Sequence, residues 1–411
     1  MEKGVAGREK IVETVCDQMR WLIDMYIVDY FVESHWDKLP SSLTEMESCE
    51  DADWSSILDE GSRLSTRSYV PPLSIQCLRV LLRQLRSEGS DHLHSFLSSK
   101  AQHEKASPKV RYNTRGVKEK KRLEIEHVVP LISHLRLSSP FSSFIDFGAG
   151  LGHLTRAIAS SIPDLSVKAV EANDTLVRRA NELDMARMME MNGGRVERLC
   201  TWVDEHSSDM IMENGREEGL CVGGLHACGD LSTCILRVAS IDERVKAVVV
   251  FGCCYHRLNG GRDKLFRQEW NENDWDVDCG WKGFPISHRF SHSNLSYCAR
   301  ELACHHNADF IEKMRQGTMC HEHQARRAVA EWIIVMAGGR RHLGLKGGNG
   351  KEDIDKIVAV YSLRLLIAPF VEELILLDRA AFLTEHRFTS FIHPLFDPRS
   401  SPRRFALIGL R

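Results

Sequence analysis

The sequence lacks a long uncharged apolar run, although one late stretch comes close. Residues 357–383 are mostly apolar, but charged side chains and a proline interrupt them at helical spacing. The interrupting residues are Arg364, Pro369, Glu372, Glu373, Asp378 and Arg379. A membrane span needs about 20 largely uncharged apolar residues. We therefore expect a buried pair of amphipathic helices there, and no membrane span.

Two further features that the sequence lacks, a secretory signal and a disulfide framework, bear on the cellular compartment of the protein. No apolar segment follows the charged start of the chain, so a secretory signal is not expected. The 13 cysteines are odd in number and scattered, which disfavours a framework of disulfides and favours a reducing compartment. We expect an intracellular protein of the cytoplasm or nucleus. The net charge of -3 neither excludes nor indicates a nucleic-acid partner.

The chain divides by pattern into three parts. Residues 1–97 carry apolar side chains at helical spacing and no catalytic motif, which predicts a helical domain that caps the protein or docks a protein partner. Residues 98–123 are basic: between 100 and 122, nine Lys or Arg stand against two Glu, a local charge of +7. They form either a solvated linker or a segment that contacts phosphates and gates substrate, and Tyr112 favours RNA. Residues 124–411 form the third part.

Apolar and helical segments alternate through this third part. Five segments have the length and composition of strands with their exit turns, namely residues 142–150, 166–173, 195–203, 219–230 and 244–256. Residues 387–411 predict two more strands joined by a loop of proline and serine. The alternation predicts an α/β fold with a Rossmann-like doubly wound sheet, beside the helical N-terminal domain.

The first predicted strand ends in a glycine-rich turn. Asp146 precedes three glycines at alternate positions, and the glycine-rich turn comprises Gly148, Ala149, Gly150 and Gly152. Glycines let the backbone approach a ligand closely, and the helix that follows points its N–H groups at that ligand. The spacing differs from the G-x-G-x-x-G of dehydrogenases. It resembles the motif of class I S-adenosylmethionine (SAM) methyltransferases.

The ends of the second and third strands add candidate cofactor residues. Glu171 follows Gly152 by nineteen residues, where a carboxylate can accept hydrogen bonds from both ribose hydroxyls. The alternative is an ordinary glutamate that opens a helix. Thr201 and Trp202 are assigned to the adenine, although Trp202 is equally compatible with core packing. Asp146 is assigned to the methionine end of the cofactor.

Polar side chains also end the fourth and fifth strands. Open α/β sheets bind ligands at the carboxyl ends of their strands. Transfer of a methyl group to a hydroxyl needs a proton acceptor, and His226, Asp230 and His256 are candidates by type and position. His226 is assigned to the cofactor as well. The alternatives are packed, hydrogen-bonded histidines and an aspartate that caps the next helix.

Cysteines are the remaining candidates for chemistry. Cys253 and Cys254 are nucleophiles, metal ligands or small packing residues; adjacent cysteines cannot easily both reach one tetrahedral metal ion, which favours packing for at least one. Both are assigned to the substrate side, with Tyr255. A second group comprises Cys298, Cys304, His305, His306, Cys320, His321 and His323. Its spacings match no common zinc finger, so no metal site is assigned, and metal binding by this group is left open.

With these residues placed, the chain resembles the methyltransferase-like protein 25 family, which includes the group labelled as ribosomal RNA adenine dimethylase domain-containing protein. The resemblance covers most of the chain, and its motifs include "DFGAGLGHLTR", "LHACGDLS" and "VVVFGCCYHRL". It implies SAM as cofactor. The family has a K-K-x-H-E run before the first strand; this chain has Lys120, Lys121 and Glu124, with Leu123 at the histidine position. Lys120 and Lys121 are assigned to the substrate.

The substrate class follows from what the motifs contain. Enzymes that methylate adenine N6 carry an N/D-x-P-Y/F/W stretch after strand four, and this chain reads "HACGDL" there. The "HACGDL" and "GCCYH" motifs resemble those of a tRNA 2'-O-methyltransferase group, so ribose 2'-O transfer to RNA is favoured over N6 transfer. A methyltransferase for a protein or small molecule and a non-catalytic scaffold with the SAM fold are the alternatives.

Overall fold

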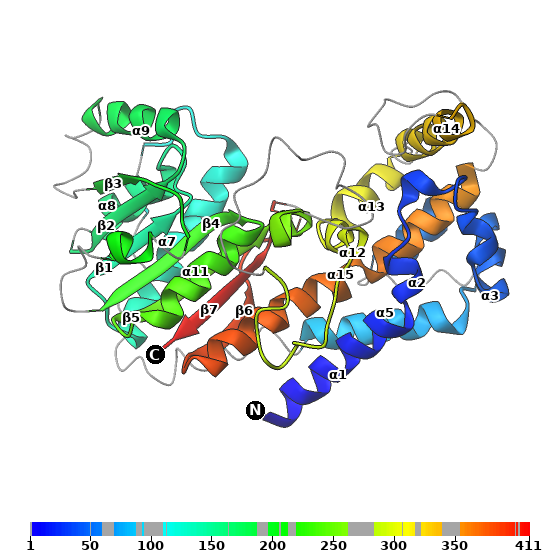
Figure 1. Cartoon of the computed structure of the whole chain (residues 1–411), viewed down its shortest axis with the longest axis horizontal. Helices are drawn as coiled ribbons and strands as arrows, with labels where there is room; N and C mark the ends of the chain where they lie inside the picture. Colours follow the sequence, from blue (N-terminus) through cyan, green and yellow to red (C-terminus); the bar gives the residue numbers. More distant parts are fainter. Residues whose placement is uncertain are drawn as a thin grey trace. The chain divides into compact units, whose positions relative to one another are not determined.

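The chain folds into two compact units. The computed structural model describes residues 2–49, 51–59, 70–87, 93, 110–111, 113–162, 164–186, 196–204, 207–212, 219–261, 283–305, 307–316, 322–338, 354–398, 400–401 and 403–411. One unit is helical and comprises residues 1–88, 263–270 and 295–374. The other contains the sheet and comprises residues 89–262, 271–294 and 375–411 (Figure 1). Helix α15 (Ile354–Glu385) contributes residues to both, and it is one continuous helix where the sequence predicted a pair.

A seven-stranded sheet organises the second unit. Its strands are β1 (Ser143–Phe147), β2 (Ser166–Glu171), β3 (Val196–Cys200), β4 (Leu220–Cys228), β5 (Val245–Cys253), β6 (Thr389–Pro394) and β7 (Phe405–Leu410). Their order across the sheet is β3-β2-β1-β4-β5-β7-β6. The first five strands are parallel, and β7 runs antiparallel to both of its neighbours. The predicted α/β doubly wound fold is confirmed.

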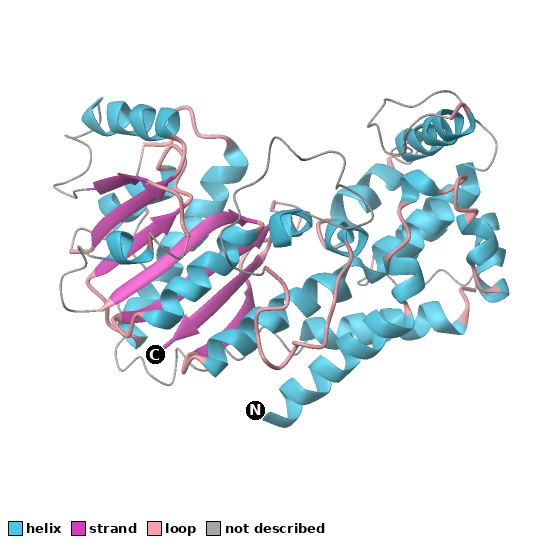
Figure 2. Ribbon diagram, viewed as in Figure 1, coloured by secondary structure: helices cyan, strands magenta, loops and turns pink. Residues whose placement is uncertain are grey.

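Helices cover both faces of this sheet, as Figure 2 shows. The helices of this unit are α7 (Glu119–Ser138), α8 (His153–Ser161), α9 (Asp174–Ala186), α10 (Ser208–Met212) and α11 (Asp230–Ile241). Alternate strand residues point to opposite faces, so Phe144 packs with α7 and α8, and Ile145 packs with α10, α11 and the end of α15. Both faces are apolar, as expected for parallel strands buried on two sides.

The strand order creates one place where a ligand fits. Strand β1 is followed along the chain by β2 on one side, whereas β4 pairs with its other side. The strand order therefore reverses between β1 and β4, and in open α/β sheets ligands bind outside the carboxyl ends at such a switch point. The turn after β1 and the end of β4 both lie at this edge of the sheet.

The other unit is built from helices. Its elements are α1 (Glu2–Gln18), α2 (Arg20–Ile23), η1 (Ile27–Asp29), η2 (His35–Lys38), α3 (Ser41–Thr44), η3 (Glu45–Ser48), α4 (Asp51–Leu58), α5 (Leu73–Ser87), α12 (Tyr297–Leu302), α13 (Asn307–Arg315) and α14 (Glu322–Met336). Buried Arg79 of α5 donates hydrogen bonds to the carbonyls of Ser56, Ile57 and Asp59, and so satisfies carbonyls at the end of α4. Buried Arg364 donates to the carbonyls of Ile23 and Cys298 and joins three helical segments.

The structure differs from the expected domain boundaries in one respect. Residues 295–374 group with the N-terminal helices, whereas the sequence pattern assigned them to the sheet-containing domain. Helical periodicity marks a buried face but does not identify the partner that covers it. Of the predicted basic segment, residues 98–109 and 112 lie outside the described residues. Among the helices that the structure describes, none has the length and apolar character needed to cross a membrane.

Candidate active site

The turn after β1 has the backbone conformation that its glycines predict. Gly148, Gly150 and Gly152 all have positive φ, at 68°, 55° and 72°. The N–H groups of Gly148 and Ala149 donate to the carbonyl of Val170 on β2, at 2.8 and 3.1 Å. The turn is therefore tied to the neighbouring strand and its shape is fixed before any ligand binds.

Gly152 is the most constrained of these glycines. A Cβ atom at this position would clash with the guanidinium of Arg198. Arg198 is held in place, because Asp184 accepts hydrogen bonds from its Nε and Nη2 at 2.6 and 3.1 Å. Only glycine combines the left-handed conformation with this close approach.

Asp146 lies beneath the turn at the end of β1. Its side chain is 2% exposed, and Oδ2 accepts a hydrogen bond of 2.6 Å from Thr155 Oγ1. Burial raises the pKa of Asp146 to about 6, although the bond from Thr155 and the charge of Lys121 oppose this shift. A cation bound here would favour the ionised carboxylate. The site thus suits the positively charged methionine end of SAM, the role predicted for Asp146.

Glu171 at the end of β2 supports the turn and retains free acceptor sites. Its Oε2 accepts from Gly150 N at 2.9 Å, and its Oε1 accepts from Asn173 N at 3.0 Å. A carboxylate has about four lone-pair positions, so each oxygen can accept one further hydrogen bond. Two such acceptors fit the two hydroxyls of a ribose. The half-buried carboxylate therefore suits the predicted contact with the cofactor.

The adenine-side candidates follow β3. Thr201 N donates to the carbonyl of Glu171 at 3.1 Å, which places Thr201 beside the ribose candidate. The side chain of Trp202 is 58% exposed. Trp202 therefore does not pack in the core, and the indole of Trp202 is accessible to a planar ligand.

His226 at the end of β4 forms a pair with a buried acid. Its Nε2 lies 2.9 Å from Glu124 Oε2, and Ser401 Oγ donates to Glu124 Oε1 at 2.8 Å. Burial raises the pKa of Glu124, but the hydrogen bonds from His226 and Ser401 and the charge of Lys120 outweigh it, so the net pKa is below the usual range. An ionised Glu124 holds a proton on Nε2, which leaves Nδ1 of His226 as the proton acceptor.

A β-bulge directs His226 into this position. In the ladder with β5, Gly224 pairs with Val250 and Ala227 pairs with Gly252, so two residues of β4 oppose one of β5. His226, one of the two, has φ of 66°, which is unusual for a residue with a side chain. Bulges beside active sites often redirect a side chain in this way.

The fifth strand leads into a short helical turn, η5 (Tyr255–Gly261), which Asp230 fixes. Asp230 Oδ1 accepts from Asn259 N at 2.9 Å, and Oδ2 accepts from Gly260 N at 2.7 Å. Both carboxylate oxygens thus hold the turn, rather than capping the helix that Asp230 begins. His256 lies in this turn and is partly exposed.

Tyr255 differs from its predicted role on the substrate side. It is 1% exposed, and the guanidinium of Arg379 lies 5.8 Å from its ring centroid. Tyr255 therefore packs against α15 and is buried beneath the turn. Lys120 and Lys121, in contrast, stand in the first turn of α7, and both influence the carboxylates of the site through their charge.

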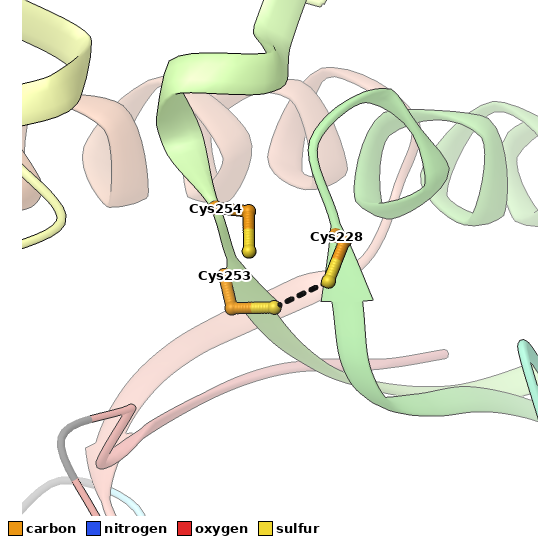
Figure 3. Close-up of side chains that lie close together, drawn as sticks. All are labelled: Cys228, Cys253 and Cys254. Atoms are coloured by element: carbon orange, nitrogen blue, oxygen red, sulfur yellow. Dashed lines mark hydrogen bonds between the residues drawn. The ribbon is translucent and has the colours of Figure 1, made fainter. Parts of the chain in front are cut away.

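Three cysteines converge where β4 and β5 end (Figure 3). The Sγ atoms of Cys228, Cys253 and Cys254 all lie within 4.8 Å of one another, and those of Cys228 and Cys253 are 2.9 Å apart. Interactions with the thiols of Cys228 and Cys253 hold the pKa of the Cys254 thiol below its ordinary value. Packing was predicted for at least one of the adjacent pair, and Cys253 is buried.

The second cysteine and histidine group is only partly described. Cys304 Sγ donates to the carbonyl of Arg300 at 3.4 Å, and His305 Nε2 pairs with Glu301 at 2.9 Å. His306, Cys320 and His321 lie outside the described residues, as does the side chain of His323. Across the described ranges, the three strand-end cysteines are the one place where at least three such ligands meet.

Sequence reasoning assigned no role to Glu124 or Cys228. Glu124 is 102 residues from its partner His226 along the chain, and no local pattern links them. Cys228 lies beside predicted site residues, but only the pairing of β4 with β5 sets it opposite Cys253. The glycine pair at 223–224 within β4 was a signal for the bulge, because glycine inside a strand often marks one.

A family model described as a methyltransferase domain matches residues 120–261. The match contains the glycine turn, Glu171, the bulge of β4 and the three cysteines. The prediction of a SAM-dependent methyltransferase domain of class I is confirmed, and SAM is the cofactor that its residues fit.

Two similar proteins support the resemblance to the methyltransferase-like protein 25 family. "Probable methyltransferase-like protein 25" of Mus musculus is 27% identical over 228 residues, which are 46% of this chain and 37% of that protein. The Homo sapiens protein of the same name is 27% identical over 248 residues, 51% of this chain and 39% of that protein. The chain thus matches well under half the length of these relatives. Their similarity supports the predicted resemblance to the methyltransferase-like protein 25 family.

Methyltransferases are among the similar solved structures. One is a SAM-dependent methyltransferase from Clostridium acetobutylicum, with 14% identity and a TM-score of 0.24, covering 35% of this chain and 55% of that one. The other is a sugar N-methyltransferase from a Streptoalloteichus species, with 14% identity and a TM-score of 0.22, covering 37% of this chain and 58% of that one.

Proposed function

We propose that the protein transfers a methyl group from SAM to RNA, with a ribose 2'-hydroxyl as acceptor and His226 as the base. One observation supports this proposal most strongly: the candidate cofactor residues and the candidate base lie side by side at the switch point of the sheet. Asp146 and Glu171 form the cofactor side at β1 and β2. The pair of His226 and Glu124 stands at the end of β4, which directly neighbours β1.

The chain's own groups supply what transfer to a hydroxyl requires. Bound SAM supplies an electrophilic methyl group, whose bond to sulfur breaks as the bond to the acceptor oxygen forms. The acceptor hydroxyl must lose its proton, and Nδ1 of His226 can take it. Glu124 keeps the other ring nitrogen protonated and stabilises the imidazolium that results. Glu124 is thus a positioning residue.

Basic residues beside this pair favour an anionic substrate. Lys118 and Lys120 are exposed at the start of α7, and Lys121 is partly exposed. Glu124 follows on the same helix, so a phosphate held by these lysines would lie close to His226. Backbone phosphates are the groups that lysines bind in RNA, which supports RNA over a neutral small molecule.

The experiment measures transfer of labelled methyl from SAM to total RNA, followed by digestion to nucleosides. Wild-type protein should yield 2'-O-methylated nucleosides. We expect His226→Gln to lower kcat by about 10²–10⁴-fold, the usual contribution of a general base. SAM affinity should be unchanged, because this proposal gives His226 the acceptor hydroxyl in place of the cofactor contact predicted from the sequence. Glu124→Gln should lower kcat and also change the pH profile, because the tautomer of His226 is no longer fixed.

A matched control is available on the same helix. His127 is exposed, and its Nδ1 bonds to the carbonyl of Leu123 on the same helix, so His127→Gln should retain full activity. Label found in protein or at adenine N6 would contradict the proposed acceptor. Full activity of His226→Gln would contradict the proposed base.

A further inference from the structure

The three strand-end cysteines have the composition of a metal site. Thiolates are soft ligands that select zinc and copper(I). Cys228 ends β4, Cys253 ends β5 and Cys254 follows it directly, so the group joins two neighbouring strands of the sheet. Figure 3 shows all three side chains directed into one space.

The local backbone explains how adjacent cysteines share that space. Successive residues of a strand point to opposite faces, so Cys253 and Cys254 should diverge. Cys254 instead has φ of 53°, in the left-handed region that residues with a side chain rarely adopt. This conformation turns its sulfur back toward Cys253. Cys228 stands directly opposite Cys253 in the ladder, which completes the group.

We propose that Cys228, Cys253 and Cys254 bind a single zinc ion at the carboxyl ends of β4 and β5. Tetrahedral thiolate coordination with Zn–S bonds of about 2.3 Å separates the sulfurs by roughly 3.8 Å. The sulfur atoms already lie within 4.8 Å of one another, so small side-chain rotations suffice. Cys228 and Cys254 are partly exposed, which leaves access for a fourth ligand from solvent or substrate.

A zinc ion bound by three thiolates has a net charge of -1. The surroundings suit that charge. Arg257 acts on Cys228 and Arg403 acts on Cys254 through positive charge, and both oppose that excess. The ion would tie the ends of the two strands together, beside the turn that carries His256. The proposal does not depend on the reaction or on the substrate proposed above.

The test measures metal content of the full chain and its response to cobalt(II), a spectroscopic substitute for zinc. Wild-type protein should contain about one zinc per chain, and the cobalt form should show sulfur-to-cobalt charge-transfer absorption. Cys228→Ala and Cys254→Ser should each weaken zinc binding by more than the roughly 10–100-fold lost with an outer-shell partner. Cys254→Ser alters a partly exposed residue, so it decides the question if Cys228→Ala does not fold.

The matched control is Cys221→Ala. Cys221 is a buried cysteine at the opposite end of the same strand β4, so its loss should leave zinc content unchanged. Three results would overturn the proposal: no zinc or cobalt bound by the wild type, full zinc content in both ligand variants, or a disulfide between Cys228 and Cys253. None of these readouts involves methyl transfer, so failure here is distinguishable from failure of the proposed reaction.

Discussion

At the scale of single residues, the buried Asp146 carboxyl is strongly affected by its surroundings. In the protein without cofactor it has a raised pKa of about 6 because it is buried. A carboxyl whose pKa is raised by folding stabilises the protein most at low pH. That contribution is lost as pH rises through the folded pKa.

Asp146→Asn should therefore stabilise the cofactor-free protein more at pH 7.5 than at pH 4. The shift corresponds to a difference of about 2 kcal/mol between the two pH values, because the unfolded carboxyl is already partly ionised at pH 4. Denaturant unfolding of both proteins at each pH measures this difference. Asp174→Asn is the control, because Asp174 is exposed. A gain that does not change with pH would contradict the account of Asp146.

The pairing of His226 with Glu124 could not be predicted from the sequence around either residue. Asp146 and Glu171 can be predicted because each lies at the end of an apolar strand, and parallel strands bring their carboxyl ends to one edge. Glu124 lies on a helix that precedes the sheet, and only tertiary packing brings it to His226. The left-handed conformation of Cys254 is equally hidden, since cysteine has no preference for it.

At the scale of elements, the exit of β5 depends on one carboxylate. Asp230 accepts backbone hydrogen bonds from Asn259 and Gly260 and so defines the shape of η5. We expect Asp230→Ala to leave these donors without their partner and to cost about 1–3 kcal/mol of stability.

Hydrogen exchange distinguishes this positioning role from the predicted catalytic one. Residues 255–261 should exchange faster in Asp230→Ala, with SAM affinity unchanged. Asp230→Asn retains one acceptor oxygen and should show a smaller effect. Unchanged exchange across the turn, with loss of methyl transfer, would favour direct catalysis by Asp230 instead.

The strands themselves can be predicted well from the sequence. The five parallel strands and the two C-terminal strands lie within the predicted segments, because runs of apolar residues bounded by glycine and polar turns leave few alternatives. The bulge in β4 is not predictable in the same way, because it arises from register against β5. Register is a property of the pair of strands.

At the scale of the whole molecule, the helical and sheet-containing units each draw on distant parts of the chain. The helical unit combines residues 1–88 with 295–374, so it draws on segments that lie far apart in the sequence. A protein partner for this unit stays a prediction. The sheet-containing unit holds all the residues assigned here to the cofactor and to proton transfer.

Binding of SAM is the property on which the account depends most. Titration calorimetry of SAM into the full chain, Glu171→Ala and Asp174→Ala tests it directly. Asp174 is the control because it is an exposed acid just beyond Glu171. We predict micromolar affinity, about -8 kcal/mol, for the wild type and for Asp174→Ala, and loss of binding in Glu171→Ala. Absence of SAM binding by the wild type, or full affinity in Glu171→Ala, would contradict the proposed cofactor site.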